Sequence, residues 1–383
     1  MALHFSKKEY KSRLKQLQKE MKKHNLDGLL LFAQESMYWL TGYDTFGFYF
    51  FQCMIVSAKG HITLLTRAPD LRQAQHTSII EEIRIWKDHG NAHPENDLHA
   101  VLKEMCFGGK TLGLEAKTVG LNAFYGKAIE KRLKSFARIK DASFLVDELR
   151  VVKSPAELDY IRIAGNLADL ALDAAIRKTK AGAYEGDILA AMHKVMFEKG
   201  GDYAGNETII GSASDALLCR YKSGRRHLSK NDQLTLEWAG AYRHYHAAMM
   251  RTIVIGKPKK RHEVLYEASR DALIAVRKAM KIGNTFADMF DAHAKVMDDA
   301  GLKQHRLNAC GYSMGASFAP CWMDPPMIYA GNKTVIKENM VLFHHMIIAD
   351  SKSDTAMTLG QSYIAKKKGA ESLTRHEIDL IRR

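Results

Sequence analysis

The sequence is poor in the features that mark secreted or membrane-embedded proteins. Its 383 residues include only five cysteines, which are scattered and form no C-x-x-C pair. An odd number of dispersed cysteines argues against a disulfide framework and favours free thiols in a reducing compartment. No run of 18 apolar residues occurs, so no membrane-spanning helix is expected.

The N-terminal segment and the charge distribution also exclude several classes of protein. Residues 1–23 are charged and amphipathic, without the apolar stretch of a secretory signal, which predicts a cytoplasmic protein. The net charge is +14, but the lysines are dispersed, and the short basic runs at 257–261 and 366–368 accompany no nucleic-acid motif. We therefore expect neither nucleic acid nor membrane as a partner, and at most a mild attraction for anionic substrates.

The chain is long for a single hydrophobic core, so two domains are expected, at residues 1–147 and 153–383. In the first domain, strands and helices alternate, which predicts a small α/β unit. The predicted helices are 5–24 and 122–133, and the predicted strands are 26–32, 53–57, 61–65, 83–86 and 111–114.

The second domain begins at a helix start signal. Ser154-Pro155-Ala156-Glu157 fits a capping box, with Ser154 as N-cap and Glu157 bonding back to it. Asp324-Pro325-Pro326 is predicted to be a turn. Further helices are predicted at 184–199, 262–281 and 287–300, and strands at 207–211, 233–239, 243–255 and 340–348. The fold class is therefore α/β (α+β).

Four segments resemble one family of proteins. They are Trp39–Asp44, the hairpin Leu236–Thr252, Cys310–Gly315 and Glu338–Val341. All four resemble the pita-bread superfamily of creatinase, aminopeptidase P and prolidase, and within it the ectoine hydrolases most closely. The resemblance implies a creatinase-like N-terminal domain, a C-terminal pita-bread domain with a curved antiparallel sheet, and a homodimer.

The metallopeptidases of this superfamily bind two metal ions, and the resemblance assigns their five ligands to positions of this sequence. Those positions hold Glu237, Ala248, Tyr312, His345 and Gly360-Gln361. Alanine has no donor atom, and four of the five expected ligands are replaced, so no two-ion site and no cofactor are expected. A single iron or zinc ion held by Glu237, His246 and His345 stays an alternative.

Alternation along the strands predicts which side chains share the site. His244, His246 and Met250 fall on the face of Ala248, and His345 falls on the face of Phe343. Histidines and a carboxylate suit acid–base catalysis. The predicted catalytic residues are Glu237, His246, His345 and Tyr312.

Substrate-binding residues are predicted from the same resemblance to the superfamily. Arg220 stands where members of the superfamily carry a substrate-contacting histidine, and it can bind a carboxylate or a developing oxyanion. Trp39 and Phe46 can line a pocket of the partner subunit, or pack at a domain interface. Arg251 and Thr252 are expected to tie the hairpin to its neighbours. The predicted substrate-binding residues are Arg220, His244, Met250, Trp39 and Phe46.

Together these features predict a metal-independent hydrolase that acts on a C–N bond, amide or amidine, of a small nitrogenous metabolite. Two alternatives stay open. The first is a binding protein that has lost catalysis, because Arg220 replaces the usual proton carrier. The second is an Xaa-Pro peptidase-like enzyme or a lyase with a rearranged metal site.

Overall fold

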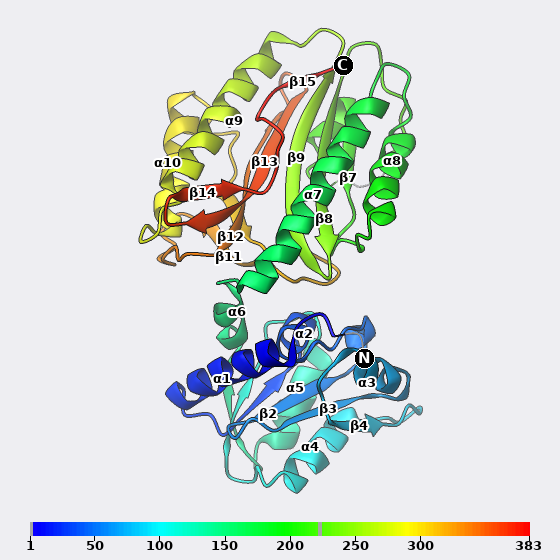
Figure 1. Ribbon diagram of the computed structural model, residues 1–383, viewed down its shortest axis with the longest axis vertical. Coiled ribbons are helices and arrows are strands. Elements are labelled where there is room, and N and C mark those ends of the chain that lie inside the picture. The colour runs from blue at the N-terminus through cyan, green and yellow to red at the C-terminus, as the bar shows by residue number, and fades with distance from the viewer. Residues whose placement is uncertain (1–2, 221–223) are drawn as a thin grey trace. The chain divides into compact units, whose positions relative to one another are not determined.

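A computed structural model of the chain describes residues 3–220 and 224–383. The chain divides into two compact units, Met1–Arg150 and Val151–Arg383. Each unit has its own sheet and its own hydrophobic cores. Figure 1 shows the N-terminal unit in blue to cyan and the C-terminal unit in green to red.

The N-terminal unit is a six-stranded sheet in the order β4-β3-β2-β1-β5-β6, with cores on both faces. Leu29 and Leu31 of the central strand enter one core, and Leu30 enters the other. A strand buried on both faces explains its uninterrupted apolar sequence. The predicted α/β organisation is confirmed.

The strands are β1 (Gly28–Leu31), β2 (Cys53–Ser57), β3 (Ile62–Arg67), β4 (Glu82–Trp86), β5 (Thr111–Leu114) and β6 (Arg138–Asp141). The helices are α1 (Lys7–Lys23), α2 (Gln34–Thr41), α3 (Leu71–Thr77), α4 (Pro94–Glu104), α5 (Ala123–Leu133) and α6 (Leu145–Arg150), with 3₁₀ turns η1 (Gly47–Tyr49) and η2 (Ala68–Asp70).

A buried carboxyl group fixes the start of α2. Glu115 accepts hydrogen bonds from the backbone N–H groups of Phe32 and Ala33 at 2.9 and 2.7 Å, and from the Ser36 hydroxyl at 2.5 Å. It thereby accepts from the backbone N–H groups of the two residues that precede the helix. Burial raises the pKa of Glu115 to about 7. This contact orients α2, which carries Trp39.

The C-terminal unit is a nine-stranded sheet in the order β11-β10-β12-β13-β9-β8-β7, with β14 paired to β13 and β15 to β9. All its described pairings are antiparallel except β15 with β9. The strands are β7 (Ile209–Ser212), β8 (Asp232–Tyr242), β9 (Tyr245–Ile255), β10 (Ala309–Ser313), β11 (Asp324–Tyr329), β12 (Val341–Asp350), β13 (Thr355–Lys366), β14 (Gly369–Ser372) and β15 (Ile381–Arg382). The helices are α7 (Pro155–Lys178), α8 (Glu185–Glu198), α9 (Lys260–Ala279) and α10 (Phe286–Asp299), with the 3₁₀ turn η3 (Ala213–Leu217).

The helices pack on one face of this sheet. The opposite face, called the open face, carries the candidate active site. Trp238 and Met249 pack in one core with residues of α7 and α8, while Leu342 and Met346 pack in another with residues of α9 and α10. Figure 1 shows the two helix pairs at opposite ends of the strand order. At Gly240, α7 comes so close that an added Cβ would lie 2.0 Å from the Ala164 carbonyl oxygen, so β8 requires glycine there.

The predicted hairpin is confirmed as β8 and β9, which pair over their full length. The connection is the two-residue turn Arg243-His244, with φ values of 49° and 64°. Two positive φ values are typical of the type I′ turn, which matches the twist of the strands. His244 therefore lies in the turn, and the prediction that it shares the strand face of Ala248 is wrong.

Other boundaries confirm or correct the sequence analysis. The capping box of Ser154 and Glu157 is present at the start of α7. Asp324-Pro325-Pro326 is not a simple turn, because these residues begin β11 and Ser313 of β10 pairs with Asp324. Strand β13 was not predicted. It contains Gly360, Gln361 and Ser362, which interrupt the apolar pattern by which a buried strand is recognised.

A tail segment ties α7 to the sheet. The buried Asp169 of α7 accepts hydrogen bonds from the Thr374 hydroxyl and from the backbone N–H of Arg375. Beyond it, β15 pairs with β9. The buried Arg251 of β9 donates to the carbonyl oxygens of Met250 and Gly360, each at 2.8 Å, and to that of Glu377 at 3.4 Å. The expectation that Arg251 ties the hairpin to its neighbours is confirmed.

Replacing Asp169 with alanine should loosen the tail segment. Hydrogen bonds to a charged group contribute about 1.5–3 kcal/mol, so we expect the free energy of unfolding to fall by about 2 kcal/mol. Trypsin should then cleave after Arg375. Asp173→Ala is the matched control, because Asp173 pairs with the half-exposed Arg375 at the surface and its loss should cost less than about 1 kcal/mol. Urea denaturation and limited proteolysis measure both variants, and equal effects would contradict the assignment.

Candidate active site

One cross-strand row carries the chemically versatile side chains of the open face. The row consists of residues that pair in turn across five adjacent strands, β7, β8, β9, β13 and β12. They are Ile209, Glu237, Met250, Gly360 and His345. Residues that face each other across strands project from the same side of a sheet. The row therefore brings Glu237 and His345, which are 108 positions apart in sequence, onto one surface.

A second row runs beside the first. Ala239 faces Ala248, Ser362 faces Phe343, and Phe343 faces Tyr312. The Ser362 hydroxyl joins β13 to β9, because it donates to the Ala248 carbonyl oxygen at 2.9 Å and accepts from the Ala248 N–H at 3.0 Å. The structure thus brings Ala248, Tyr312 and His345 to one place, as the resemblance implied.

The space between these rows is filled by an aromatic ring. Phe343 packs against Tyr312 and His345, with ring centroids 5.3 and 5.7 Å apart. An added Cβ at Gly360 would lie 2.6 Å from Cζ of Phe343. Glycine is therefore required at 360 as long as Phe343 keeps this position, and Phe343 occupies the space into which a longer side chain would project.

The residues present do not fit the two-ion centre of the metallopeptidases. Ala248 and Gly360 offer no side-chain donor, and Tyr312 offers only a phenol. Within residues 3–220 and 224–383, no group of three or more His, Cys, Asp or Glu side chains could hold a metal ion. Glu237, His246 and His345 are not grouped in this way in that part of the chain, and the single-ion alternative stays a prediction.

A buried carboxyl and a buried phenol form the centre of the site. Burial raises the pKa of Glu237 to about 7, although the charge of Arg220 and a hydrogen bond from Tyr312 act in the opposite direction. Burial and the Glu237 carboxyl raise the pKa of Tyr312 well above its ordinary value. The indole N–H of Trp322 donates to the Tyr312 oxygen at 2.9 Å, which leaves the phenol proton for Glu237. Trp322 was not predicted, because no motif marks it.

His345 is neutral at physiological pH. Burial, His293 and Arg220 together lower its pKa to about 3. Its Nδ1 atom is buried without a hydrogen-bond partner in the described part of the chain. A buried polar atom of this kind costs free energy unless a water molecule or a ligand bonds to it, so His345 is suited to hold one of these.

His246, a predicted catalytic residue, lies in the interior of the sheet. It is fully buried, and its Nε2 accepts a hydrogen bond from the backbone N–H of Gly205 at 2.9 Å. Burial lowers its pKa to about 4. A histidine that accepts through Nε2 and stays neutral is not poised to donate a proton there. The contact of His246 with Gly205 positions residue 205, and its catalytic role stays a prediction.

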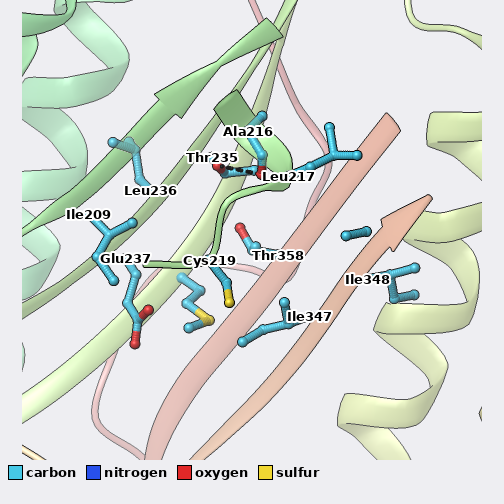
Figure 2. Close-up of a pocket in the computed structure, with 12 residues that line it drawn as sticks. Ile209, Ala216, Leu217, Cys219, Thr235, Leu236, Glu237, Ile347, Ile348 and Thr358 are labelled. Atoms are coloured by element: carbon cyan, nitrogen blue, oxygen red, sulfur yellow. Dashed lines mark hydrogen bonds between the residues drawn. The ribbon is translucent and has the colours of Figure 1, made fainter. Parts of the chain in front are cut away.

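A pocket opens beside Glu237. It is small and partly open to solvent. Figure 2 shows Glu237 reaching into it from β8, Cys219 from the segment after η3, and Ile347 from β12. Its lining consists of Ile209, Ala216, Leu217, Cys219, Thr235, Leu236, Glu237, Met250, Ile347, Ile348, Ala349 and Thr358.

The predicted substrate-binding residues are placed in different surroundings. Met250 lines the pocket, and the charge of the exposed Arg220 acts on Glu237, Tyr312 and His345. His244 stacks on Phe318 at the hairpin turn, with ring centroids 4.1 Å apart.

The other two belong to the N-terminal unit. Trp39 is only 3% exposed, packs in the core of that unit and lies against the guanidinium of Arg13. This favours packing over substrate contact. Phe46 is 83% exposed, so its side chain is available for an external contact.

A sheet with this topology, covered by helices on one face, defines a pita-bread protein, and its open face carries a carboxyl, a phenol and an imidazole. The model for "Metallopeptidase family M24" matches residues 159–367, and that for "Creatinase/Prolidase N-terminal domain" matches residues 13–152. The first match covers more than half of the chain, which therefore belongs to metallopeptidase family M24.

Relatives and solved structures agree with this assignment. An "Ectoine hydrolase" of Halomonas elongata is 26% identical over 391 aligned positions, covering 97% of both chains. An "Xaa-Pro dipeptidase" of Pyrococcus furiosus is 23% identical over 371 positions, covering 97% of this chain and all of the relative. An Xaa-Pro dipeptidase from Bacillus anthracis superposes with a TM-score of 0.84 at 19% identity, covering 98% of this chain and 100% of that structure.

These findings confirm the predicted superfamily and fold, and they confirm the predicted enzyme class, a hydrolase, at the level of the family. The reaction, the substrate, the role of each site residue and the oligomeric state stay predictions. In the part of the chain that the structure covers, no helix combines the length and apolarity needed to span a bilayer.

The raised pKa of Glu237 should be visible in stability. Between its ordinary pKa of 4.5 and about 7, the folded protein binds the proton more tightly than the unfolded chain. The free energy of unfolding therefore falls as pH rises through this window. Glu237→Gln removes this loss, so the variant should match the wild type at pH 4 and exceed it by about 3 kcal/mol at pH 8.

Chemical denaturation between pH 4 and 8 tests this expectation, with Glu338→Gln as the control. Glu338 is an exposed partner of Lys367, so its variant should show no pH-dependent difference from the wild type. A Glu237→Gln curve parallel to that of the wild type would show that the carboxyl titrates normally.

The packing at Gly360 gives a separate prediction. Gly360→Ala should destabilise the protein by about 1–3 kcal/mol, as overpacking does, because the new Cβ collides with Phe343. In a Phe343→Leu background the same substitution should cost clearly less. A double-mutant cycle from denaturation curves measures the coupling, and additive effects would contradict the contact.

Proposed function

We propose that the protein is a metal-independent hydrolase of a C–N bond, amide or amidine, in a small nitrogenous metabolite. The observation that carries the proposal is Glu237, a buried carboxyl with a pKa of about 7 that is hydrogen-bonded to Tyr312. A group that titrates near neutral pH can both accept and donate a proton. The relative named ectoine hydrolase gives the class of substrate.

In the proposed reaction one carboxyl group carries out both proton transfers, because it first accepts a proton and then donates it. Ionised Glu237 takes a proton from a water molecule, whose oxygen forms a bond to the amide or amidine carbon. The charge that develops on the former carbonyl oxygen or amidine nitrogen is stabilised by Tyr312 or by Arg220. The C–N bond then breaks, and protonated Glu237 gives its proton to the leaving nitrogen. The unpartnered Nδ1 of His345 holds the attacking water.

A homodimer is also proposed, and it rests on the resemblance to creatinase-like proteins. In this proposal the small-molecule substrate is the only ligand, with no nucleic acid or membrane partner. Sedimentation velocity of the purified protein would determine the oligomeric state, and a monomer at micromolar concentration would count against the dimer.

A binding protein without catalysis is the second candidate. The observation in its favour is the low pKa of His246 and His345, about 4 and 3, which leaves neither as a proton carrier at neutral pH. A metal-dependent peptidase resembling the Xaa-Pro dipeptidases is the third. Ligand binding without product would support the binding protein, and chelator-sensitive cleavage of an Xaa-Pro dipeptide would support the peptidase.

Hydrolysis should survive chelation and depend on Glu237. We expect purified protein to convert at least one member of a panel of lactams, cyclic amidines and N-acyl amino acids with EDTA present. Glu237→Gln should lower kcat by about 10²–10⁴-fold, and Tyr312→Phe by less. The control Glu338→Gln should retain wild-type activity. Product formation is followed by mass spectrometry.

Two results would overturn the proposal. Stoichiometric metal in the active protein, together with loss of turnover in EDTA and recovery on adding the ion, would establish a metal mechanism. Unchanged kcat in a folded Glu237→Gln variant would remove Glu237 from the chemistry.

A further inference from the structure

The phenol of Tyr312 is held by a buried tryptophan. Trp322 is 1% exposed, and its indole N–H donates to the phenol oxygen of Tyr312 at 2.9 Å. An indole N–H is a donor and offers no acceptor, so the phenol oxygen can only accept in this contact. The phenol proton is therefore turned away from Trp322 and is offered to a different acceptor. On the open face, Tyr312 consequently acts as a hydrogen-bond donor.

Trp322 is itself fixed through its backbone. Its N–H donates to Oδ1 of Asn206 at 3.2 Å, and its carbonyl oxygen accepts from the Ser317 hydroxyl at 3.3 Å. An added Cβ at Gly205 would lie 2.9 Å from the backbone nitrogen of Trp322, so the segment 205–206 lies directly against this residue. These contacts set the position of the indole independently of the phenol.

The segment 205–206 is in turn held by His246 of β9. The backbone N–H of Gly205 donates to Nε2 of His246 at 2.9 Å. Because Nε2 accepts, the proton of the neutral ring is on Nδ1. A chain of contacts therefore runs from β9, through this segment, to Trp322 and the phenol. A side chain at the end of such a chain keeps one orientation, which is what a positioning group requires.

We propose that Trp322 is a positioning residue of the active site: its indole N–H fixes the Tyr312 phenol as a donor toward the open face, so that the substrate atom beside the phenol is a hydrogen-bond acceptor. The inference rests on the proposed function for the reaction itself. A hydroxyl group that accepts one hydrogen bond donates the next one more strongly. The pair is therefore suited to a carbonyl oxygen, or an unprotonated amidine nitrogen, on which negative charge develops as water adds to the carbon. An amidinium or ammonium group has no acceptor to offer there.

Indole N–H signals in a two-dimensional NMR spectrum test the contact without reference to the reaction. The chain has four tryptophans, and the indoles of Trp86 and Trp238 donate to backbone carbonyl oxygens at 3.0 Å. Trp322→Phe assigns the signal of Trp322. Tyr312→Phe should move that signal upfield, because the indole loses its acceptor, and should leave those of Trp86 and Trp238 in place. An unmoved Trp322 signal would overturn the proposal.

The positioning role is tested by removing the indole N–H alone. Benzothienylalanine at position 322 keeps the shape of the ring and has a sulfur atom in place of the N–H. Isothermal titration calorimetry should show a γ-lactam bound about tenfold more weakly than by the wild type. The matching thiolactam should bind with nearly unchanged affinity, since its sulfur is the weaker acceptor. The same replacement at Trp238, whose indole donates to a carbonyl oxygen of α7, is the matched control and should change neither affinity.

A double-mutant cycle distinguishes positioning from a general structural role. In a Tyr312→Phe background the replacement of Trp322 should have no further effect, because Trp322 acts through the phenol. For any compound of the panel that is hydrolysed, the replacement should likewise lower kcat/KM about tenfold, and only when Tyr312 is present. Equal losses in the two backgrounds, equal losses for lactam and thiolactam, or no detectable lactam binding would each overturn the proposal. Lactam binding with the expected dependence on Trp322, but without hydrolysis of any panel compound, would overturn the proposed function alone.

Discussion

The proposed chemistry of this protein depends on the removal of one carboxyl group from water. Glu237 lies on the open face of β8, next to the edge strand β7, and burial raises its pKa to about 7 while Tyr312 and Arg220 oppose that shift. A carboxylate in water would be fully ionised at neutral pH and a poor acid. The sheet register controls this burial, because it places Met250 and Ile209 directly beside Glu237.

The rest of the C-terminal unit maintains that register. Helices cover the opposite face of the sheet, and Gly240 allows α7 to approach β8 closely. Ser362 joins β9 to β13 through the backbone of Ala248, and Arg251 joins the same strands through the carbonyl oxygens of Met250 and Gly360. These contacts are specific to one register, since a slip by one residue would turn every side chain of a strand to the other face.

The sequence predicted those parts of the site that depend on local patterns of residues. The hairpin, the capping box at Ser154 and the common surface of Glu237, Tyr312 and His345 followed from strand alternation and from the resemblance. It failed where a contact joins distant segments or where a pattern is broken. Trp322 bonds to Tyr312, and Gly205 bonds to His246, but neither residue belongs to a motif. Strand β13 was not predicted, because its glycine and polar residues interrupt the apolar pattern.

The contact between Phe343 and Gly360 also constrains how the site can change over generations. A larger residue at 360 meets the Phe343 ring, whereas a smaller residue at 343 leaves room beneath it. A smaller residue at 343 therefore lowers the cost of a later change at 360, where an added Cβ alone is expected to cost about 1–3 kcal/mol. Lineages that carry a carboxylate at 360 should be separated from this chain by at least two steps, and the intermediate form must survive with an unfilled space on its sheet.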